Sequence, residues 1–424
     1  MGLHTSQHVP IIQYAPPHRR EHMHVTFLVV PGHGHINPTL GVVAELVKRG
    51  HRVTYPVPEK FVDAIQATGA ESVLYESPLN QTWDPPRRFT SSFFASFQLR
   101  LLEEALVMVP VLEKYLAGNP PDLISYDGFV PFAARVLGHA WNRPLLMTSP
   151  TLASNENFSL REQFAKRGMT RPAEDDPAVI ELRERFATFA TGYGVPSDRM
   201  DAMRELSASG DAPMIVFVPK RFQPAADTFG DRYVFVGPCL TERPHQGDWR
   251  PSGNEPVLLI SLGTAFNDRP EFFRACLEAF AGTPWQVVMS IGARIDPADL
   301  GPLPSNVAVH PHVPQVQVLR HARAFVSHGG MGSTMEALYH AVPLVAVPQM
   351  PEQEINAERV VELGLGRMLH PDAVTGAAIR DAVDELATDE ATRARLADMS
   401  RHIRATDAAT VAADVMEARA RNGS

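Results

Sequence analysis

The sequence predicts an α/β protein with two parallel-sheet domains. In both halves of the chain, short runs rich in β-branched residues alternate with longer helical patterns, which is typical of parallel strands flanked by helices. At 424 residues the chain is too long for one ordinary hydrophobic core, so two domains and a linker are expected. The apolar content of 44% and the charged content of 21% are those of a soluble globular protein.

The first half opens with an apolar run at residues 24–30, which predicts a buried strand. Residues 31–38 are rich in proline and glycine and predict a loop. The periodicity from residue 39 to residue 49 predicts a helix that ends at Gly50. Further strands are expected at residues 52–57, 123–126 and 144–148.

The second half repeats this design. It is expected to contain strands at residues 256–261, 285–291, 307–309, 325–327 and 344–347, and helices at residues 270–281, 316–321 and 333–340. The tail at residues 379–420 is strongly helical and is expected to return across the first domain.

The expected architecture is two Rossmann-like domains that face each other across a cleft. Residues 1–22 contain histidines and prolines but no apolar h-region, so we expect a disordered leader there. The other predicted limits are residues 23–237 for the N-terminal domain, 238–255 for the linker, 256–402 for the C-terminal domain and 403–424 for a helix packing on the first domain. Residues 77–96 and 155–213 lack strand alternation, and such insertions lie at the carboxyl ends of strands, where α/β domains bind ligands.

Charge and composition exclude several classes of protein. The net charge of −9 and the lack of a basic stripe argue against a nucleic-acid partner. No apolar run of about 18 residues is present, so no integral membrane association is expected. The two cysteines, Cys239 and Cys276, are far apart and have no metal-ligand spacing, which indicates packed thiols in a reducing cytoplasm. The oligomeric state, monomer or homodimer, stays open.

The most informative stretch is His328-Gly-Gly-Met-Gly-Ser-Thr-Met-Glu336, which follows a predicted strand at residues 323–327. Glycines at a strand-to-helix turn let the backbone close on a ligand, and free N–H groups at a helix N-terminus attract anions. A diphosphate suits this turn, and His328 is placed to donate a hydrogen bond to a phosphate oxygen. Glu336 lies on the helix face that carries Ser333, where a carboxylate can accept hydrogen bonds from a ribose diol.

Other phosphate-binding devices are absent from the sequence. Residues 330–335 lack the third glycine of a dinucleotide fingerprint, and residues 31–38 interleave their glycines with histidines, which disfavours NAD and FAD. The sequence contains neither a GxxxxGK[ST] loop nor an Asp-x-Asp triplet. We therefore expect no metal ion and no cofactor, with the helix dipole and a histidine holding the diphosphate.

Together with Val313-Pro-Gln315, Pro343, Pro348, Glu352-Gln353 and Asn356, this stretch resembles the signature box of inverting, UDP-dependent glycosyltransferases of the GT-B type. From Met23 onward the chain is similar to the bacterial macrolide and flavonoid glucosyltransferases, the group of oleandomycin glycosyltransferase and Bacillus YjiC. The resemblance implies an N-terminal acceptor-binding domain and a C-terminal domain that binds a nucleotide sugar. It also implies transfer of glucose from UDP-glucose to a hydroxyl of a macrolide, a flavonoid or a related polyketide or phenol.

The resemblance also implies the donor site. Gln315 and the Val313 backbone would bind the base, and Glu336 would bind the ribose. The diphosphate would be bound by Thr264, His328 and Ser333, with Gly330 and Gly332 in the turn around it. Glu352 and Gln353 would bind the sugar hydroxyls. The family often has Trp where this chain has His312, and often has Asn at the position of Gly332. Both departures are expected to loosen base discrimination, so a TDP-sugar donor stays open.

An acceptor hydroxyl needs a base that removes its proton during attack. His33 and His35 lie in the first predicted βα loop, and Asp127 ends a buried strand whose carboxyl end converges on that loop. A carboxylate partner orients a basic histidine, as in hydrolytic triads. The resemblance implies that His35 is the base and Asp127 its partner, so that one direct displacement inverts the anomeric centre and yields a β-glycoside.

Aromatic and apolar residues near the expected cleft predict a hydrophobic acceptor pocket. The candidates are Trp83, Phe93, Phe94, Phe97, Phe129 and Met147, although residues of these types more often belong to the core. Two other functions stay open. One is a TDP-deoxysugar antibiotic glycosyltransferase. The other is a nucleotide-sugar 2-epimerase, which shares the two-domain design and the diphosphate site but needs no acceptor pocket.

Overall fold

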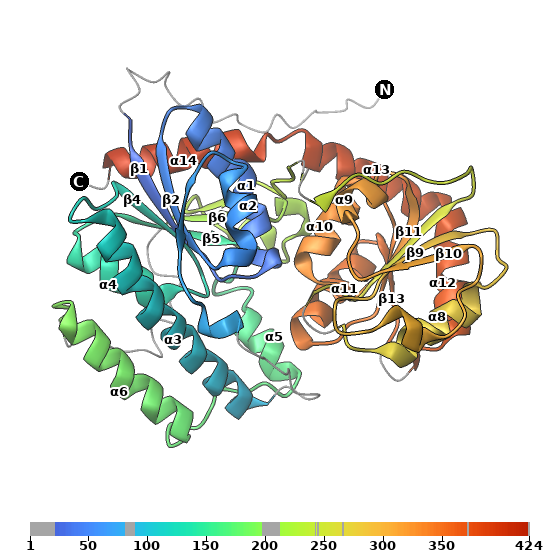
Figure 1. Ribbon diagram of the computed structural model, residues 1–424, viewed down its shortest axis with the longest axis horizontal. Helices are drawn as coiled ribbons and strands as arrows, with labels where there is room; N and C mark the ends of the chain where they lie inside the picture. The colour runs from blue at the N-terminus through green and yellow to red at the C-terminus, as the bar shows by residue number, and fades with distance from the viewer. Residues whose placement is uncertain are drawn as a thin grey trace, which may run out of the picture.

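The computed structural model describes residues 22–80, 90–196, 213–241, 243, 246–264, 267–370 and 373–422. Each half of the chain forms one parallel sheet covered by helices, and the two lobes lie side by side (Figure 1). The prediction of an α/β protein with two Rossmann-like domains is confirmed. No helix among the described residues is both long enough and apolar enough to cross a membrane.

The first sheet has seven strands in the order β3-β2-β1-β4-β5-β6-β7. The strands are β1 (His24–Leu28), β2 (Arg52–Val57), β3 (Glu71–Leu74), β4 (Leu123–Asp127), β5 (Leu145–Ser149), β6 (Met214–Val216) and β7 (Tyr233–Phe235). The helices of this lobe are α1 (His33–Lys48), α2 (Val62–Gln66), α3 (Ser91–Leu116), α4 (Pro131–Ala140), α5 (Leu160–Lys166) and α6 (Pro177–Gly192). The direction in which strands are added reverses between β1 and β4, so this is the switch point at which open α/β sheets bind ligands.

The second sheet has six strands in the order β10-β9-β8-β11-β12-β13 and its own switch point between β8 and β11. The strands are β8 (Val257–Ser261), β9 (Gln286–Ser290), β10 (Val307–His310), β11 (Ala322–Ser327), β12 (Leu344–Ala346) and β13 (Gly366–Met368). The helices are α8 (Pro270–Phe280), α9 (Gln315–Leu319), α10 (Met331–Tyr339), α11 (Pro351–Glu362), α12 (Gly376–Thr388), α13 (Glu390–Arg404) and α14 (Ala408–Asn422). Short 3-10 helices lie at Glu59–Phe61, Pro78–Asn80, Lys220–Phe222, Ala226–Thr228 and Pro297–Leu300.

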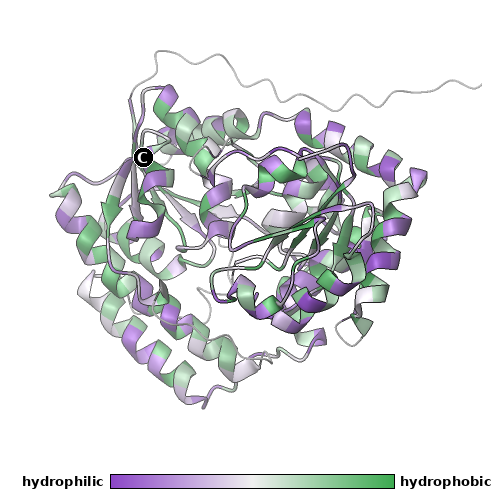
Figure 2. Cartoon of the chain, turned by 45° about the vertical axis from the view of Figure 1, so that its right-hand side comes forward, coloured by the Kyte–Doolittle hydropathy of each residue, from purple (hydrophilic) through white to green (hydrophobic). Residues whose placement is uncertain are grey.

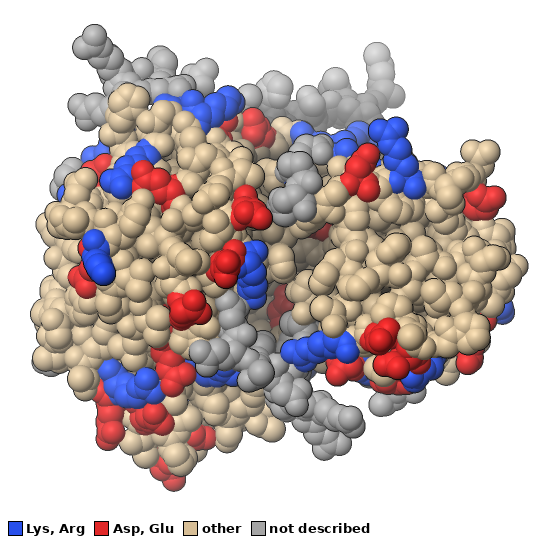
Figure 3. Space-filling view, in the orientation of Figure 1, with Lys and Arg blue, Asp and Glu red and all other residues tan. Residues whose placement is uncertain are grey.

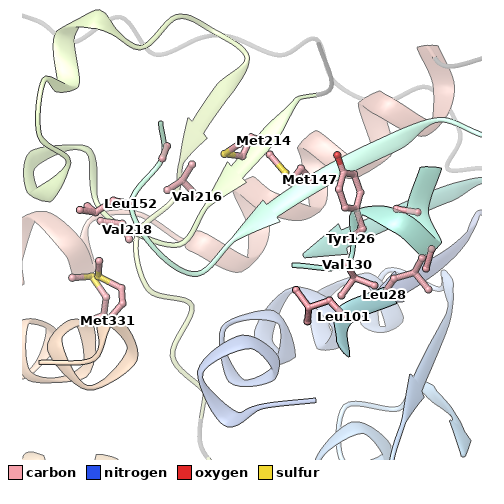
Figure 4. Packing of buried hydrophobic residues seen from close by; sticks show 14 of the residues in the cluster. Leu28, Leu101, Tyr126, Val130, Met147, Leu152, Met214, Val216, Val218 and Met331 are labelled. Carbon is pink, nitrogen blue, oxygen red and sulfur yellow. The ribbon is translucent and has the colours of Figure 1, made fainter. Parts of the chain in front are cut away.

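The central strands of both sheets are buried along their whole length, as near-continuous apolar runs in parallel sheets require. The hydropathy colouring shows the strands as apolar and the outer faces of many helices as polar (Figure 2). One apolar cluster continues from the first lobe into the second. In it, Leu152 and Val218 lie near Met331, the first residue of α10 (Figure 4). The two lobes therefore meet through apolar side chains next to the Gly-rich turn.

The C-terminal helices run back across the molecule from the second lobe to the first (Figure 1). Helix α14 buries Ala412, Ala413 and Met416 in the same apolar cluster as Val43 and Leu46 of α1. Arg49, which caps α1, donates from Nη1 to Asp414 at 2.6 Å and to Glu417 at 2.9 Å on α14. The last helix thus lies against the first sheet's lobe through both apolar and charged contacts.

The prediction of a loop at residues 31–38 is wrong for most of that segment. Helix α1 begins at His33, with an extended Gly32 before it, and the N–H groups of His35 and Ile36 both donate to the Gly32 carbonyl. Pro38 lies inside the helix. A proline so near the N-terminus removes one hydrogen bond, and the buried face from Ile36 onward makes up for that loss.

Four short strands were also missed: β3, β6, β7 and β13. Three of them have only three residues each, too few for an alternating pattern to stand out, and they form because a neighbouring strand offers free backbone groups. The segment at residues 77–96, which lacks strand alternation in the sequence, contains the start of helix α3 at Ser91, where the side chain of Thr90 caps the helix.

The two sheets leave residues 236–256 as the connection between β7 and β8, of which residues 242, 244 and 245 lie outside the described part. Of the predicted leader at residues 1–22, only His22 is described. The domain limits stay predictions.

Candidate active site

The switch point of the first sheet brings His35 and Asp127 together. Asp127 is the last residue of β4, and His35 lies in the first turn of α1, directly after the adjacent strand β1. His35 Nδ1 lies 2.7 Å from Asp127 Oδ2, with the histidine side chain 26% exposed and the carboxylate 2% exposed. One member of the pair is therefore open to a ligand, and the other is sealed behind it.

Asp127 is held in place by a second hydrogen bond. Its Oδ1 accepts from the backbone N–H of Phe129 at 2.8 Å, which forms an Asx turn. Burial alone would lower the pKa of His35, but the negative charge and hydrogen bond of Asp127, aided by the charge of Glu352, outweigh it and raise that pKa above its ordinary value of 6.5. His33, in contrast, is exposed and packs edge-on against Phe61, with ring centroids 4.9 Å apart.

The switch point of the second sheet brings the turn after β8 next to the turn after β11. His328 follows β11, and its imidazole packs against Gly263 and Gly330. A Cβ atom added at Gly263 would lie 2.6 Å from the ring, and one added at Gly330 would lie 2.3 Å from it. Exposed Thr264 follows Gly263 directly, so it lies in the turn that reaches His328. Burial lowers the pKa of His328 to about 4, although a hydrogen bond with the Ser261 backbone acts in the opposite direction. The ring is therefore neutral at pH 7. It can donate a hydrogen bond but brings no positive charge.

The polar residues of the Gly-rich turn form one network. Gln315, the first residue of α9, donates from Nε2 to Ser333 Oγ at 3.1 Å and to Glu336 Oε2 at 2.7 Å. Both partners lie on α10, one turn apart. Glu336 also pairs with Arg243 of the connecting segment at 2.8 Å. Gln315, predicted to hold the base, thus contacts both Ser333, predicted to hold the diphosphate, and Glu336, predicted to hold the ribose.

Glu352 reaches toward the opposite lobe. It is the second residue of α11, and its Oε1 accepts from Thr151 Oγ1 beyond β5 at 3.4 Å and from Asn356 Nδ2 at 2.6 Å. Burial raises the pKa of Glu352. The hydrogen bond from Asn356, the charge of His35 and the hydrogen bond from Thr151 each lower that pKa, but by less. His35 and Glu352 therefore act on each other electrostatically from different lobes, and the surface is hollowed between these lobes (Figure 3).

Gln353 lies deeper than its neighbour. It is buried, and its Oε1 accepts from the backbone N–H of Gln349 at 2.8 Å. Its side-chain carbonyl is therefore used by the turn that enters α11. If Gln353 binds a sugar hydroxyl as predicted, it does so through its amide N–H groups.

Known proteins resemble this chain over nearly its whole length. Residues 274–418 match the family model for the C-terminal domain of erythromycin biosynthesis protein CIII-like proteins. The chain is 41% identical over 405 residues to the NDP-glycosyltransferase YjiC of Bacillus licheniformis, a match that covers 94% of this chain and 98% of that protein. The chain belongs to the YjiC-like NDP-glycosyltransferase family.

Two further comparisons agree. Oleandomycin glycosyltransferase of Streptomyces antibioticus is 36% identical over 398 residues, covering 93% of this chain and 90% of that one. The crystal structure of CalG4, the calicheamicin glycosyltransferase, has a TM-score of 0.80 at 42% identity and covers 95% and 99% of the two chains. The resemblance drawn from the signature box is thereby confirmed at the level of family and GT-B fold.

The lobe that is predicted to bind the acceptor has aromatic rings next to His35. Phe129 lies edge-on to His35 at 5.2 Å, and Phe97 of α3 lies 6.3 Å from Phe129. Phe94 is half-buried on the same helix. Met147 is buried in the core cluster near Met214 (Figure 4), and its place in the pocket stays a prediction. Trp83 lies outside the described residues.

Sequence reasoning missed Thr151 and Arg243 as neighbours of the site. Both come from segments without periodicity or motif, so no signal in the sequence marks them. Phe97, one of the aromatic candidates from the sequence, lies one helical turn after Phe93 on α3, and the two rings stack. Half-buried Val313 packs against the core, and exposed His312 stands before it. No cluster of three or more His, Cys, Asp and Glu within the described ranges suits a metal ion.

The turn offers a matched pair of glycine substitutions. A Cβ at Gly330 would lie 2.3 Å from His328 Nε2, whereas one at Gly332 would meet nothing within 4 Å. We expect Gly330→Ala to displace the imidazole and raise the Kd of the nucleotide about tenfold or more, the loss of one charge-assisted hydrogen bond. Gly332→Ala, two residues along, should leave that Kd within about twofold. Isothermal titration with UDP and TDP measures both, and equal affinities in the two variants would contradict the role given to His328.

Proposed function

We propose that this glycosyltransferase is an inverting enzyme that transfers glucose from UDP-glucose to a hydroxyl of a hydrophobic natural product, with His35 as general base. The observation that carries the proposal is the 2.7 Å contact between His35 Nδ1 and the buried Asp127 carboxylate. Because the ionised carboxylate only accepts hydrogen bonds, Nδ1 carries the proton and Nε2 offers its lone pair to the acceptor.

The reaction follows from this geometry. His35 Nε2 takes the acceptor proton while the acceptor oxygen attacks the anomeric carbon on the face opposite the nucleotide. Asp127 stabilises the imidazolium that develops. Neutral His328 and the N-terminus of α10 stabilise the diphosphate as it leaves. One displacement of an α-linked donor yields a β-glycoside.

The raised pKa of His35 predicts the pH dependence of transfer. The base must be neutral, so kcat/KM should fall toward acid with a midpoint above the ordinary histidine value of 6.5. Asp127→Asn removes the charge that raises this pKa, so the midpoint should move to lower pH while the plateau also falls. Glu352→Gln should shift the midpoint in the same direction by less, because its charge is the weakest of the contributions that raise the pKa. An acid limb that stays in place in Asp127→Asn would contradict the pairing.

The first test is a mass-spectrometric assay with UDP-glucose and a mixed panel of macrolide and flavonoid acceptors. The expected result is a mass gain of one hexose on an acceptor, lost in His35→Ala, with a β-linkage by NMR coupling constants. A product with an α-linkage would overturn the inverting mechanism. Turnover of the donor to an isomer without acceptor would overturn transfer in favour of a nucleotide-sugar 2-epimerase.

A second donor class has specific support. His312 is exposed where the family often has a stacking tryptophan, and the space beside Gly332 is open where the family often has asparagine. Both features weaken the case for strict recognition of uridine. TDP-glucose and a TDP-deoxysugar therefore belong in the same assay, and a higher kcat/KM with either would reassign the donor.

A further inference from the structure

A buried arginine from the connection between the two sheets enters the donor site. Arg243 lies between β7 and β8, and its guanidinium pairs with Glu336 Oε1 at 2.8 Å. The arginine and glutamate side chains are only 6% and 7% exposed. The signature box does not include this arginine, because Arg243 lies about 70 residues before Val313, the first residue of the box.

The pair completes a chain of contacts that ends at the Gly-rich turn. Glu336 has both carboxylate oxygens occupied, Oε1 by Arg243 and Oε2 by Gln315 Nε2 at 2.7 Å. Gln315 continues to Ser333 at 3.1 Å. The orientation of the carboxylate that is proposed to accept the ribose hydroxyls is therefore determined from two sides, one of which is the inter-sheet connection.

The positive charge of Arg243 compensates a buried negative charge. A carboxylate as buried as Glu336 is costly without a neighbouring cation, and Arg243 is the cation with which the described residues supply it. The guanidinium has five N–H donors. Within the part of the chain that the structure describes, its buried Nε has no hydrogen-bond partner. Donors thus remain for an oxygen-rich ligand next to Glu336.

We propose that Arg243 is a positioning residue for the nucleoside part of the donor. It holds Glu336 oriented for the ribose diol, and it connects the nucleotide site to the segment that joins the lobes. This rests on the proposed function only in that the ligand is a nucleoside diphosphate sugar. Arg243 itself does not take part in the transfer step.

The test measures nucleotide binding and donor kinetics in the full-length chain. Arg243→Ala should raise the Kd of UDP, or of TDP if the wild type prefers it, by roughly 30-fold or more, since it leaves a buried carboxylate without its partner. The KM of the donor should rise in parallel, while kcat and the KM of the acceptor change little. Arg243→Lys retains the charge without the planar fork and should recover part of the affinity.

Two controls separate this role from a general effect on the connection. Arg250 lies in the same segment, but its side chain is 83% exposed and pairs only loosely with Asp248 at 3.6 Å, so Arg250→Ala should leave the Kd unchanged. In a Glu336→Gln background, Arg243→Ala should have a much smaller effect, because the two side chains act as one unit. Thermal unfolding without ligand shows that each variant is folded.

The outcomes are distinct. An unchanged nucleotide Kd in folded Arg243→Ala would overturn the positioning role and leave the proposed function standing. Tighter binding in that variant would also overturn it, because the arginine would then compete with the ribose for Glu336. A wild-type chain that binds neither UDP nor TDP would overturn both the proposed donor and this inference.

Discussion

Replacing His35 with alanine is expected to lower kcat by about 10²–10⁴-fold, the usual contribution of a positioned general base. The ring lies 2.7 Å from a buried carboxylate and is itself partly open to solvent, so its loss removes the proton acceptor without opening a core cavity. Asp127 keeps its hydrogen bond from the Phe129 N–H, and thermal unfolding shows whether the variant is folded. Steady-state kinetics at saturating donor and acceptor measure the effect on the chemical step.

His33→Ala is the matched control. His33 precedes His35 by two residues in the same helical turn, but it is exposed and packs on Phe61. Its removal should leave kcat within a few-fold of the wild type. His35→Ala and Asp127→Ala combined should cost about as much as His35→Ala alone, because a base and its orienting partner act as one unit. A folded His35→Ala enzyme with near wild-type kcat would remove His35 as the base.

Replacing Arg49 with alanine is expected to lower the free energy of unfolding by about 3–5 kcal/mol, as for other buried ion pairs that lose one member. The Arg49 side chain is 7% exposed and contacts Glu45 of α1 together with Asp414 and Glu417 of α14. Without it, the equally buried Glu417 keeps His51 and the more distant Arg421 as its charged partners among the described residues. Urea denaturation, combined with calorimetry to separate the transitions of the two lobes, measures the loss.

Arg421→Ala serves as the control for Arg49. Arg421 shares the partner Glu417, but at 3.6 Å and from an exposed position, so the expected change is below about 1 kcal/mol. Equal destabilisation by the two substitutions would mean that the contact of α14 with α1 depends on its apolar face alone. In that case Met416 and its neighbours, and not the ion pairs, would hold the C-terminal helix on the first lobe.

Most of the fold could be predicted because parallel strands that are buried on both faces consist of continuous apolar runs in the sequence. The runs at residues 24–28, 123–127 and 257–261 are buried along their whole length in the structure. The errors came where local preference and packing disagree. Pro38 argued for a loop, yet helix α1 begins five residues before it, because its apolar face is buried against the first sheet. Three-residue strands such as β6 have too little pattern to be recognised without their neighbours.

The candidate site divides in the same way. Spacing along the chain was enough to identify the Gly-rich turn, because Ser333 and Glu336 lie on one face of a single helix and follow His328 directly. The partners of those residues could not be read from spacing. Thr151 meets Glu352 across some 200 positions of sequence, and Arg243 meets Glu336 from a segment without pattern.

Local sequence therefore specified the elements of this glycosyltransferase and the chemistry that each one carries: apolar runs for strands, a glycine turn for an anion, and a histidine and an aspartate at strand ends. The folded chain determined which of these groups act together. The order of strands places His35 beside Asp127 and the Gly263 turn beside His328. The packing of the two lobes brings Glu352 to Thr151. The reason is physical: hydrogen bonds and ion pairs depend on distances of about 3 Å in space, and sequence separation carries no information on such distances beyond a single helix or turn.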